Sequence, residues 1–392
     1  MLEFTEEKLL LLKRSPIYNF SLSSKELFHS NFLYWLLNDI VINENKSGDI
    51  ACISFWDLLY THLNLPQEYS GYKIENQENT IHREKNNLDL TFSIVNLENN
   101  KINVIIENKV KSIPYKEQLE KYSNTAPQNH LFILLTLHDP ISLKVDGKII
   151  LANKKIWHVI TYKNLSDILK EYIESSTKNT INYRNYIIND YLQLIDFLVE
   201  VDNTAERNFE GNFNWYSGGF YKSLIELRIA DFYIKKMYKL LEDDIKNEIS
   251  KNESLKGLIS ENDSSSNKIM FYCGFTNKTG LIDIRFKYLK NMFVGIQIQG
   301  NQFRLFIENQ KVIELDKLKK IIEGKEWLFD FSIIENNVVP DEFKIYPKDK
   351  GFNNYSNKFY YKYVKIPENT AKKQLIECIL EYLEIYKEKL EF

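Results

Sequence analysis

Two neighbouring segments, one alternating and one apolar, constrain the fold of this chain more than any other feature. Residues 88–94 place leucine, phenylalanine or isoleucine at every second position, with aspartate, threonine and serine between them. This is the period-two pattern of a strand with one buried face. A polar, asparagine-rich stretch follows at residues 97–101, and residues 102–110 resume as a second apolar segment. The two segments are therefore predicted to form a β-hairpin within a sheet.

Charged residues end the second predicted strand. Glu107 and Lys109 are two positions apart, so they lie on one face of the strand, because side chains alternate across it. Residues 104–106 are apolar on both faces, and the neighbouring strand carries Asp89. We therefore expect an aspartate, a glutamate and a lysine to meet where the hydrophobic part of the sheet stops.

These three side chains suit the hydrolysis of phosphodiester bonds. Two carboxylates can hold a hard divalent cation such as Mg²⁺, which keeps several waters and takes phosphate oxygens as its other ligands. The cation lowers the pKa of a bound water and neutralises charge that develops on the phosphate, while an adjacent lysine orients that water or stabilises the transition state. The pattern thus favours a metal-dependent phosphodiesterase.

Two predicted helices carry further polar residues. Residues 24–37 form a strongly apolar helix that carries Glu26 and, three positions later, His29. A second helix begins near residue 114, and its Gln118 and Tyr122, at i and i+4, share one face. Both helices can direct these side chains toward the predicted site. The alternative is that Gln118 and Tyr122 are ordinary surface residues and His29 an ordinary core residue.

Asp89 precedes the run Glu107-Asn108-Lys109, and the helix with Gln118-x-x-x-Tyr122 follows it. This arrangement resembles the PD-(D/E)xK nuclease superfamily in its branch with a QxxxY motif. The apolar helix that carries Glu26 resembles the opening helix of one family in that superfamily, whose glutamate lies near the metal. The resemblance covers residues 26–197, with a leucine where the proline of the motif's name would stand. It implies an α/β, restriction-endonuclease-like mixed sheet flanked by helices.

The resemblance also implies a metal centre. Asp89 and Glu107 would bind one or two Mg²⁺ ions, with Mn²⁺ as the alternative ion. The carbonyl of Asn108 would assist them, and Glu26 would complete the metal shell directly or through a water molecule.

The remaining motif residues complete the implied catalytic set. Lys109 would lie beside the attacking water, and Gln118 and Tyr122 would orient Lys109 or the phosphate. The resemblance implies a nuclease, most simply a DNA endonuclease, with an antiviral role in defence against foreign DNA. Two alternatives stay open: a nucleic-acid-binding module that has lost cleavage, and an RNase with the same site.

Length and element order predict two domains. A chain of 392 residues is long enough for both. Residues 1–201 are predicted to be the nuclease domain, and the polar residues 202–214 a linker. The nuclease domain is expected to add these elements to the hairpin: helices at 50–65, 164–174 and 183–201, and strands at 129–137 and 155–161.

Residues 215–392 are predicted to form an α+β domain with an antiparallel sheet. The expected elements are helices at 221–249 and 368–390 and strands at 269–275, 280–288, 292–299, 302–308, 343–346 and 359–366. Two roles are open for this domain, namely substrate recognition and homodimer formation, and a dimer would let the enzyme cut both strands of a duplex. Recognition would use exposed aromatic and basic residues on the sheet, such as Tyr288, Lys290, Phe303, Arg304, Tyr360, Tyr361 and Lys362.

Composition limits the partners and the cellular compartment. The net charge of −3 gives no global attraction to nucleic acid, so phosphate binding depends on a local patch and the metal. Three widely separated cysteines without a CxxC pair predict neither a disulfide scaffold nor a zinc site and favour the reducing cytoplasm. No apolar run approaches the roughly 20 residues that span a bilayer, so a membrane partner is not expected.

Overall fold

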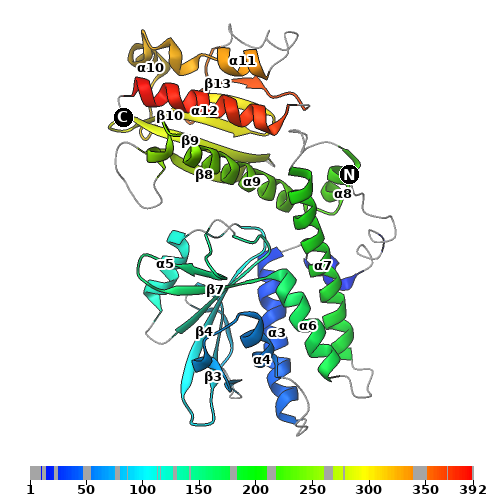
Figure 1. The fold of residues 1–392 in the computed structure, drawn as a ribbon. Coiled ribbons are helices and arrows are strands. Elements are labelled where there is room, and N and C mark those ends of the chain that lie inside the picture. Colours follow the sequence, from blue (N-terminus) through cyan, green and yellow to red (C-terminus); the bar gives the residue numbers. More distant parts are fainter. Residues whose placement is uncertain are drawn as a thin grey trace. The chain divides into compact units, whose positions relative to one another are not determined.

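The computed structural model describes residues 10, 15–21, 25–46, 54–75, 80–85, 87–112, 114, 116–126, 130–140, 143–176, 183–209, 218–259, 268–276, 279–338, 351–368 and 370–390. The chain divides into two compact units, Leu2–Asn203 and Thr204–Phe392 (Figure 1). None of the described helices is both long enough and apolar enough to cross a membrane.

A seven-stranded mixed sheet forms the centre of the N-terminal unit. Its strands are ordered β1-β3-β4-β5-β7-β6, and β2 pairs with the first half of β3, on the edge whose far end pairs with β1. The β3–β4 pair is antiparallel, whereas β4–β5 and β5–β7 are parallel. The predicted α/β mixed sheet is therefore confirmed. The strands are β1 Lys73–Ile74, β2 His82–Lys85, β3 Leu88–Val95, β4 Lys101–Lys109, β5 His130–Thr136, β6 Lys148–Ile150 and β7 Ile156–Thr161.

The predicted hairpin is the β3–β4 pair. Its register matches Leu90 with Ile106 and Val95 with Lys101. The asparagines of the turn close it: the Asn96 side chain accepts hydrogen bonds from the backbone N–H groups of Glu98 and Asn100. This is the local side-chain bonding that makes asparagine frequent in turns.

Helices cover both faces of this sheet. On one face, leucines of α3 (Lys25–Lys46), α4 (Phe55–His62) and α6 (Tyr162–Ser176) meet Leu90 of β3 and Ile106 of β4 around a small cavity of about 30 Å³. On the other face, Leu119 of α5 (Lys116–Thr125) packs with Ile105 and Phe132. Fully burying one such side chain stabilises the fold by about 1.5–3 kcal/mol.

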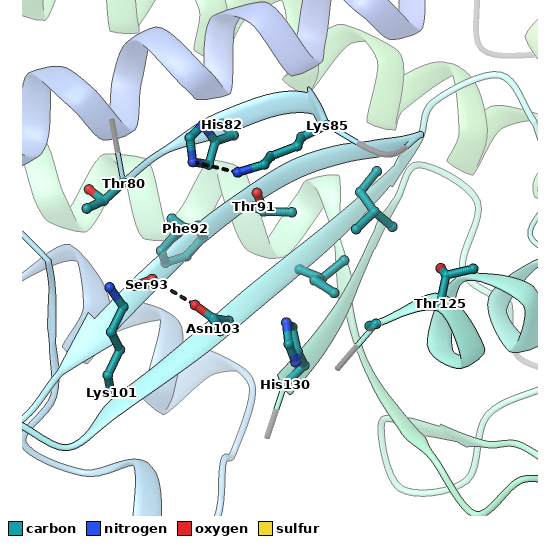
Figure 2. Close-up of a pocket in the computed structure, with 13 residues that line it drawn as sticks. Thr80, His82, Lys85, Thr91, Phe92, Ser93, Lys101, Asn103, Thr125 and His130 are labelled. Carbon is teal, nitrogen blue, oxygen red and sulfur yellow. Dashed lines mark hydrogen bonds between the residues drawn. The ribbon is translucent and has the colours of Figure 1, made fainter. Parts of the chain in front are cut away.

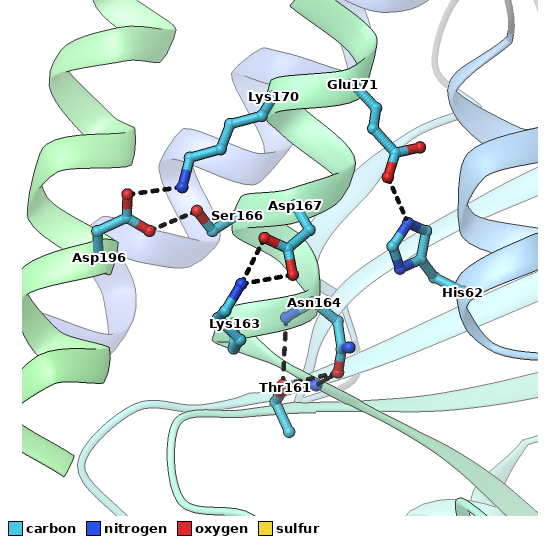
Figure 3. Close-up of polar contacts among 9 residues, drawn as sticks. All are labelled: His62, Thr161, Lys163, Asn164, Ser166, Asp167, Lys170, Glu171 and Asp196. Carbon is cyan, nitrogen blue, oxygen red and sulfur yellow. Dashed lines mark hydrogen bonds and ion pairs between the residues drawn. The ribbon is translucent and has the colours of Figure 1, made fainter. Parts of the chain in front are cut away.

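Polar contacts fix helix α6 in the N-terminal unit. Thr161 and Asn164 cap its first turn, because the Thr161 N–H donates to the Asn164 side chain and the Asn164 N–H to the Thr161 hydroxyl. Asp196 of helix α7 (Tyr183–Phe209) binds Ser166 and Lys170 of α6. Figure 3 shows these contacts together with the bond from His62 of α4 to Glu171.

The C-terminal unit contains a six-stranded antiparallel sheet in the order β12-β13-β11-β10-β9-β8. Its antiparallel pairing confirms the prediction of a second, α+β part of the chain. The strands are β8 Met270–Thr276, β9 Thr279–Leu289, β10 Met292–Gln299, β11 Gln302–Asn309, β12 Asn353–Tyr355 and β13 Phe359–Lys365. The helices are α8 Gly218–Glu226, α9 Ala230–Lys251, α10 Leu315–Ile322, α11 Ser332–Asn337 and α12 Lys372–Lys389.

The helix predicted over residues 221–249 is instead two helices. The chain breaks between α8 and α9, where Arg228 takes a left-handed φ of 56°. The N–H of Ile229 bonds back to the carbonyl of Leu224, which is the bond that a left-handed C-terminal cap makes. The break buries both Leu227 and Ile229, so burial of two apolar side chains outweighs the cost of a left-handed arginine.

The linker prediction is wrong for residues 202–209, which continue helix α7. Ala205 and Phe209 lie four and eight positions after Val201, and all three are buried. This four-residue spacing is that of one helix face, although the intervening residues are all polar. Residues 210–214 and the strand predicted at 343–346 lie outside the described residues.

Two of the residues expected to be exposed for recognition are buried. Phe303 is fully buried and lies near Tyr382 of α12, and Tyr360 is also buried. Their neighbours Arg304 and Tyr361 are half-buried, and the Arg304 guanidinium lies 4.4 Å from the centre of the Tyr361 ring. The alternation along β11 and β13 therefore divides the predicted set between the two faces of the sheet.

Candidate active site

The ends of β3 and β4 bring together the acidic and basic residues that the sequence singles out. Leu90 of β3 pairs with Ile106 of β4 in an antiparallel register. The next residues toward that end of the hairpin, Asp89 and Glu107, therefore lie opposite each other. The Lys109 Nζ lies 2.6 Å from Glu107 Oε1, and Asp89 Oδ2 accepts the N–H of Asn108 at 2.7 Å. An aspartate, a glutamate and a lysine thus occupy one end of the hairpin.

Glu107 is a buried carboxylate with an unused oxygen. Its side chain is 2% exposed, and its Oε2 is buried without a hydrogen-bond partner in the part of the chain that the structure describes. Burial, followed by the negative charge of Asp89, raises the pKa of Glu107 to about 7, against the opposing charge of Lys109. Burial also raises the pKa of Asp89, and the N–H of Asn108 offsets part of that rise. One proton or one cation would relieve this pair of carboxylates.

Lys109 stays charged in this setting. Burial acts to lower the pKa of its ammonium group, but the carboxylates of Glu107 and Asp89 outweigh burial, so the pKa lies above its usual value. The 2.6 Å contact with Glu107 holds the ammonium beside the two carboxylates. It is therefore a fixed donor for a water or phosphate oxygen that enters the site.

The donor set fits a divalent cation. Asp89 and Glu107 supply hard oxygen ligands, and the unpaired Oε2 of Glu107 is a buried anionic atom that a cation would satisfy. Among the described residues, no group of three or more histidine, cysteine, aspartate or glutamate side chains is arranged to hold a metal. Two carboxylates are enough for Mg²⁺, because it commonly keeps waters and binds phosphate oxygens as its other ligands.

Glu26 lies near this pair but is engaged elsewhere. Its Oε1 accepts three hydrogen bonds, from the Lys111 N–H at 2.9 Å, the Ser112 N–H at 2.9 Å and the Ser112 hydroxyl at 2.7 Å. Burial acts to raise its pKa, but these bonds and the charge of Lys109 together lower it. Glu26 thus ties the start of α3 to the segment that follows β4. Its predicted part in the metal shell stays a prediction.

Gln118 and Tyr122 lie on one face of α5, as their spacing predicts. Gln118 Nε2 donates to the Tyr122 hydroxyl at 2.9 Å, and the Tyr122 ring packs against the core that Leu119 and Ile105 share. Within the described residues, neither side chain hydrogen-bonds to Lys109. Their predicted task of orienting Lys109 or a phosphate therefore stays a prediction.

A buried hydrogen-bond network behind β4 was not predicted. Asn108 points to the face opposite Glu107, where its Oδ1 accepts the Tyr162 hydroxyl at 2.8 Å and its Nδ2 donates to the Ser30 hydroxyl at 3.2 Å. Tyr162 also bonds Tyr191, whose hydroxyl lies 2.9 Å from His29 Nδ1. The network joins α3, α6 and α7 to the residue between Glu107 and Lys109.

Only one direction in this network is fixed by its chemistry. A phenol has one proton, and the Tyr162 hydroxyl gives its proton to Asn108 Oδ1, whereas the direction of the bond between His29 and Tyr191 depends on the tautomer of His29. Burial lowers the pKa of His29 to about 3, so its ring is neutral. His29 is therefore a core residue that orients its neighbours. The sequence signal for this network was Asn108, an amide residue between two charged residues at the end of β4.

One of the three comparisons with known proteins gave a match. No curated protein and no solved structure matched the chain. The model of the PD-(D/E)XK nuclease superfamily matches residues 16–193, which include β3, β4, α5 and the buried network. Over these residues, the chain is similar to the PD-(D/E)XK nuclease superfamily.

Proposed function

We propose that this protein is a divalent-metal-dependent nuclease that hydrolyses phosphodiester bonds, and specifically a DNA endonuclease. One observation carries the proposal: the buried Glu107 keeps an unpaired oxygen beside Asp89, with the Lys109 ammonium 2.6 Å from its other oxygen. A buried carboxylate pair is costly unless a cation or proton compensates it.

Each residue has a distinct part in the proposed reaction. Asp89 and Glu107, with the Asn108 carbonyl, would hold Mg²⁺ or Mn²⁺. A bound ion of this kind lowers the pKa of a coordinated water and neutralises charge on the phosphate. Lys109 donates to the attacking water or to a phosphate oxygen, because Glu107 holds its ammonium at that position. Gln118 and Tyr122 position the substrate phosphate from α5.

The choice of DNA, the role in antiviral defence and the cytoplasmic setting rest on the sequence resemblance and composition. For the C-terminal unit we propose substrate recognition or homodimer formation. Support for recognition comes from the stacked pair of Arg304 and Tyr361 on its sheet, since arginine and aromatic side chains can stack on bases.

Incubation with labelled plasmid DNA and with total RNA tests the proposal. Each substrate is tested with Mg²⁺, with Mn²⁺ and with a chelator, using the wild type, Asp89→Asn and Lys121→Ala. Lys121 is an exposed lysine of α5 and serves as the control for a lost surface charge. We expect metal-dependent cleavage of the plasmid by the wild type and Lys121→Ala, and none by Asp89→Asn. Cleavage of RNA alone would make the protein an RNase, and binding without cleavage would make it a binding module.

A further inference from the structure

A cavity of about 330 Å³ lies beside the candidate active site. Its lining comes from β2, β3, β4, the end of α5 and the start of β5. Figure 2 shows Thr91, Ser93 and Asn103 on the strands, with His82 and Lys85 on β2. This volume is at the low end of the range for small-molecule sites.

The cavity and the two carboxylates share one face of the hairpin. Thr91 and Ser93 follow Asp89 at every second position of β3, and Ile105 and Asn103 precede Glu107 in the same way on β4. Since a strand rises about 3.3 Å per residue, the cavity floor extends from about 7 to about 13 Å from the carboxylates. An extended ligand with a phosphate at Asp89 and Glu107 would continue directly into the cavity.

The lining suits a flat, anionic ligand with a polar edge. None of the described residues that line the cavity is acidic, whereas Lys85 and Lys101 contribute positive charge. Ile105 and Leu88 supply apolar surface. Lys101 is already paired with Glu75 at 2.6 Å. The Lys85 ammonium has only the His82 ring as a polar partner among the described residues, so it is the more available cation.

One lining residue at the floor can donate hydrogen bonds to such a ligand. Asn103 accepts the Ser93 hydroxyl at 2.9 Å through Oδ1, which leaves its amide N–H groups as donors. Amide donors of this kind match the acceptor atoms on the edge of a nucleobase.

We propose that this cavity holds one nucleotide of the strand being cut, with its base unstacked, a few positions from the scissile phosphate. The inference rests on the proposed nuclease function and adds the substrate class: single-stranded nucleic acid, or a duplex with an unpaired or flipped base. A base can enter such a pocket only after it leaves the stack, and that step costs least where the base is already unpaired.

An abasic scan tests the proposal on the wild-type protein. A labelled single strand of fixed sequence is prepared with one abasic site placed at each position in turn, and a matched blunt duplex is prepared beside it. Cleavage is mapped with Mg²⁺, and binding is measured by anisotropy with a chelator, so that binding and cleavage are separate readouts. We expect the single strand to be preferred by roughly ten- to a hundredfold. Removal of the base at one position, which lies at a constant distance from the cut, should lower the cleavage rate by roughly tenfold.

Matched variants connect this sensitivity to the cavity. Asn103→Trp fills the floor, whereas Asn100→Trp places the same side chain in the exposed turn of the same hairpin. Asn103→Trp should lose the sensitivity to the abasic position, and Asn100→Trp should keep it. Circular dichroism and thermal denaturation test whether both variants are folded. If Asn103→Trp is not folded, the abasic scan on the wild type alone decides whether the cavity holds a nucleotide.

The outcomes separate the two proposals. If the wild type cuts the duplex and the single strand equally, with no sensitive abasic position, the nucleotide site is refuted while the nuclease assignment stands. If the wild type cuts neither substrate with Mg²⁺ or Mn²⁺, the proposed function fails, and this inference fails with it.

Discussion

The raised pKa of Glu107 predicts that metal binding releases a proton at mildly acidic pH. With a pKa of about 7 in the metal-free protein, Glu107 is protonated below neutrality, and a cation can bind its carboxylate only when that proton leaves. Below pH 7 the apparent affinity for Mg²⁺ or Mn²⁺ should therefore fall about tenfold for each pH unit. Well above pH 7 it should be constant.

Calorimetric titration with Mn²⁺ in buffers of different ionisation enthalpy measures both quantities. We expect release of about one proton per ion near pH 6 and almost none near pH 8.5. Glu98→Gln, in the exposed turn of the same hairpin, is the matched control and should leave both values unchanged. Constant affinity and no proton release across this range would refute the assignment of Glu107 as a buried metal ligand.

The same pKa has a consequence for stability that needs no metal. Between 4.5, the usual pKa of a glutamate, and about 7, the folded protein binds more protons at Glu107 than the unfolded chain does. The free energy of unfolding should therefore fall as the pH rises through this window, by about 3 kcal/mol from Glu107, since one pKa unit corresponds to about 1.4 kcal/mol. Urea denaturation in a chelator measures this decrease, and Mg²⁺ should reverse it.

Three substitutions test the other parts of the site. Lys109→Ala should lower the cleavage rate by about a hundredfold or more, while calorimetry shows Mn²⁺ binding nearly intact; unchanged cleavage would remove the lysine from the mechanism. Tyr162→Phe should lower the free energy of unfolding by about 2–3 kcal/mol, because it leaves buried partners unsatisfied, whereas Tyr183→Phe, at an exposed position, should not change it in urea denaturation. Glu26→Gln should weaken Mn²⁺ binding less than tenfold, in contrast to Asp89→Asn; equal losses would place Glu26 in the metal shell.

Sequence pattern was sufficient for the features that depend on local periodicity. The alternation in β3 separates its two faces, and the charged residues at the end of β4 mark where burial stops, so the meeting of Asp89 with Glu107 could be predicted. The apolar run in β4 does not distinguish its faces, and the register itself comes from the structure. The break between α8 and α9 behaved differently. The sequence at Arg228 gives no signal for a left-handed conformation, because glycine is the residue that usually indicates it.

The features that sequence missed depend on contacts between distant segments. Val201, Ala205 and Phe209 are separated by polar residues, so their shared buried face was obscured by composition. Tyr162 and Ser30 are 54 and 78 residues from Asn108 along the chain. Only the packed helices bring them to the strand, and no spacing rule connects them in advance.

The side chain of Asn108 accepts from Tyr162 and donates to Ser30 and to the carbonyl of Glu26, so the nearly isosteric acid cannot make the same set of bonds. An aspartate at this position would keep the acceptor for Tyr162 but lose the donor to Ser30, and it would place a third negative charge one residue from Glu107. The two sides of β4 thus impose opposite electrostatic demands on consecutive residues: an acid on the side where we propose that the ion binds, and a neutral amide where helices close over the strand. A laboratory search for altered metal preference should accordingly vary the outer face and keep position 108 fixed.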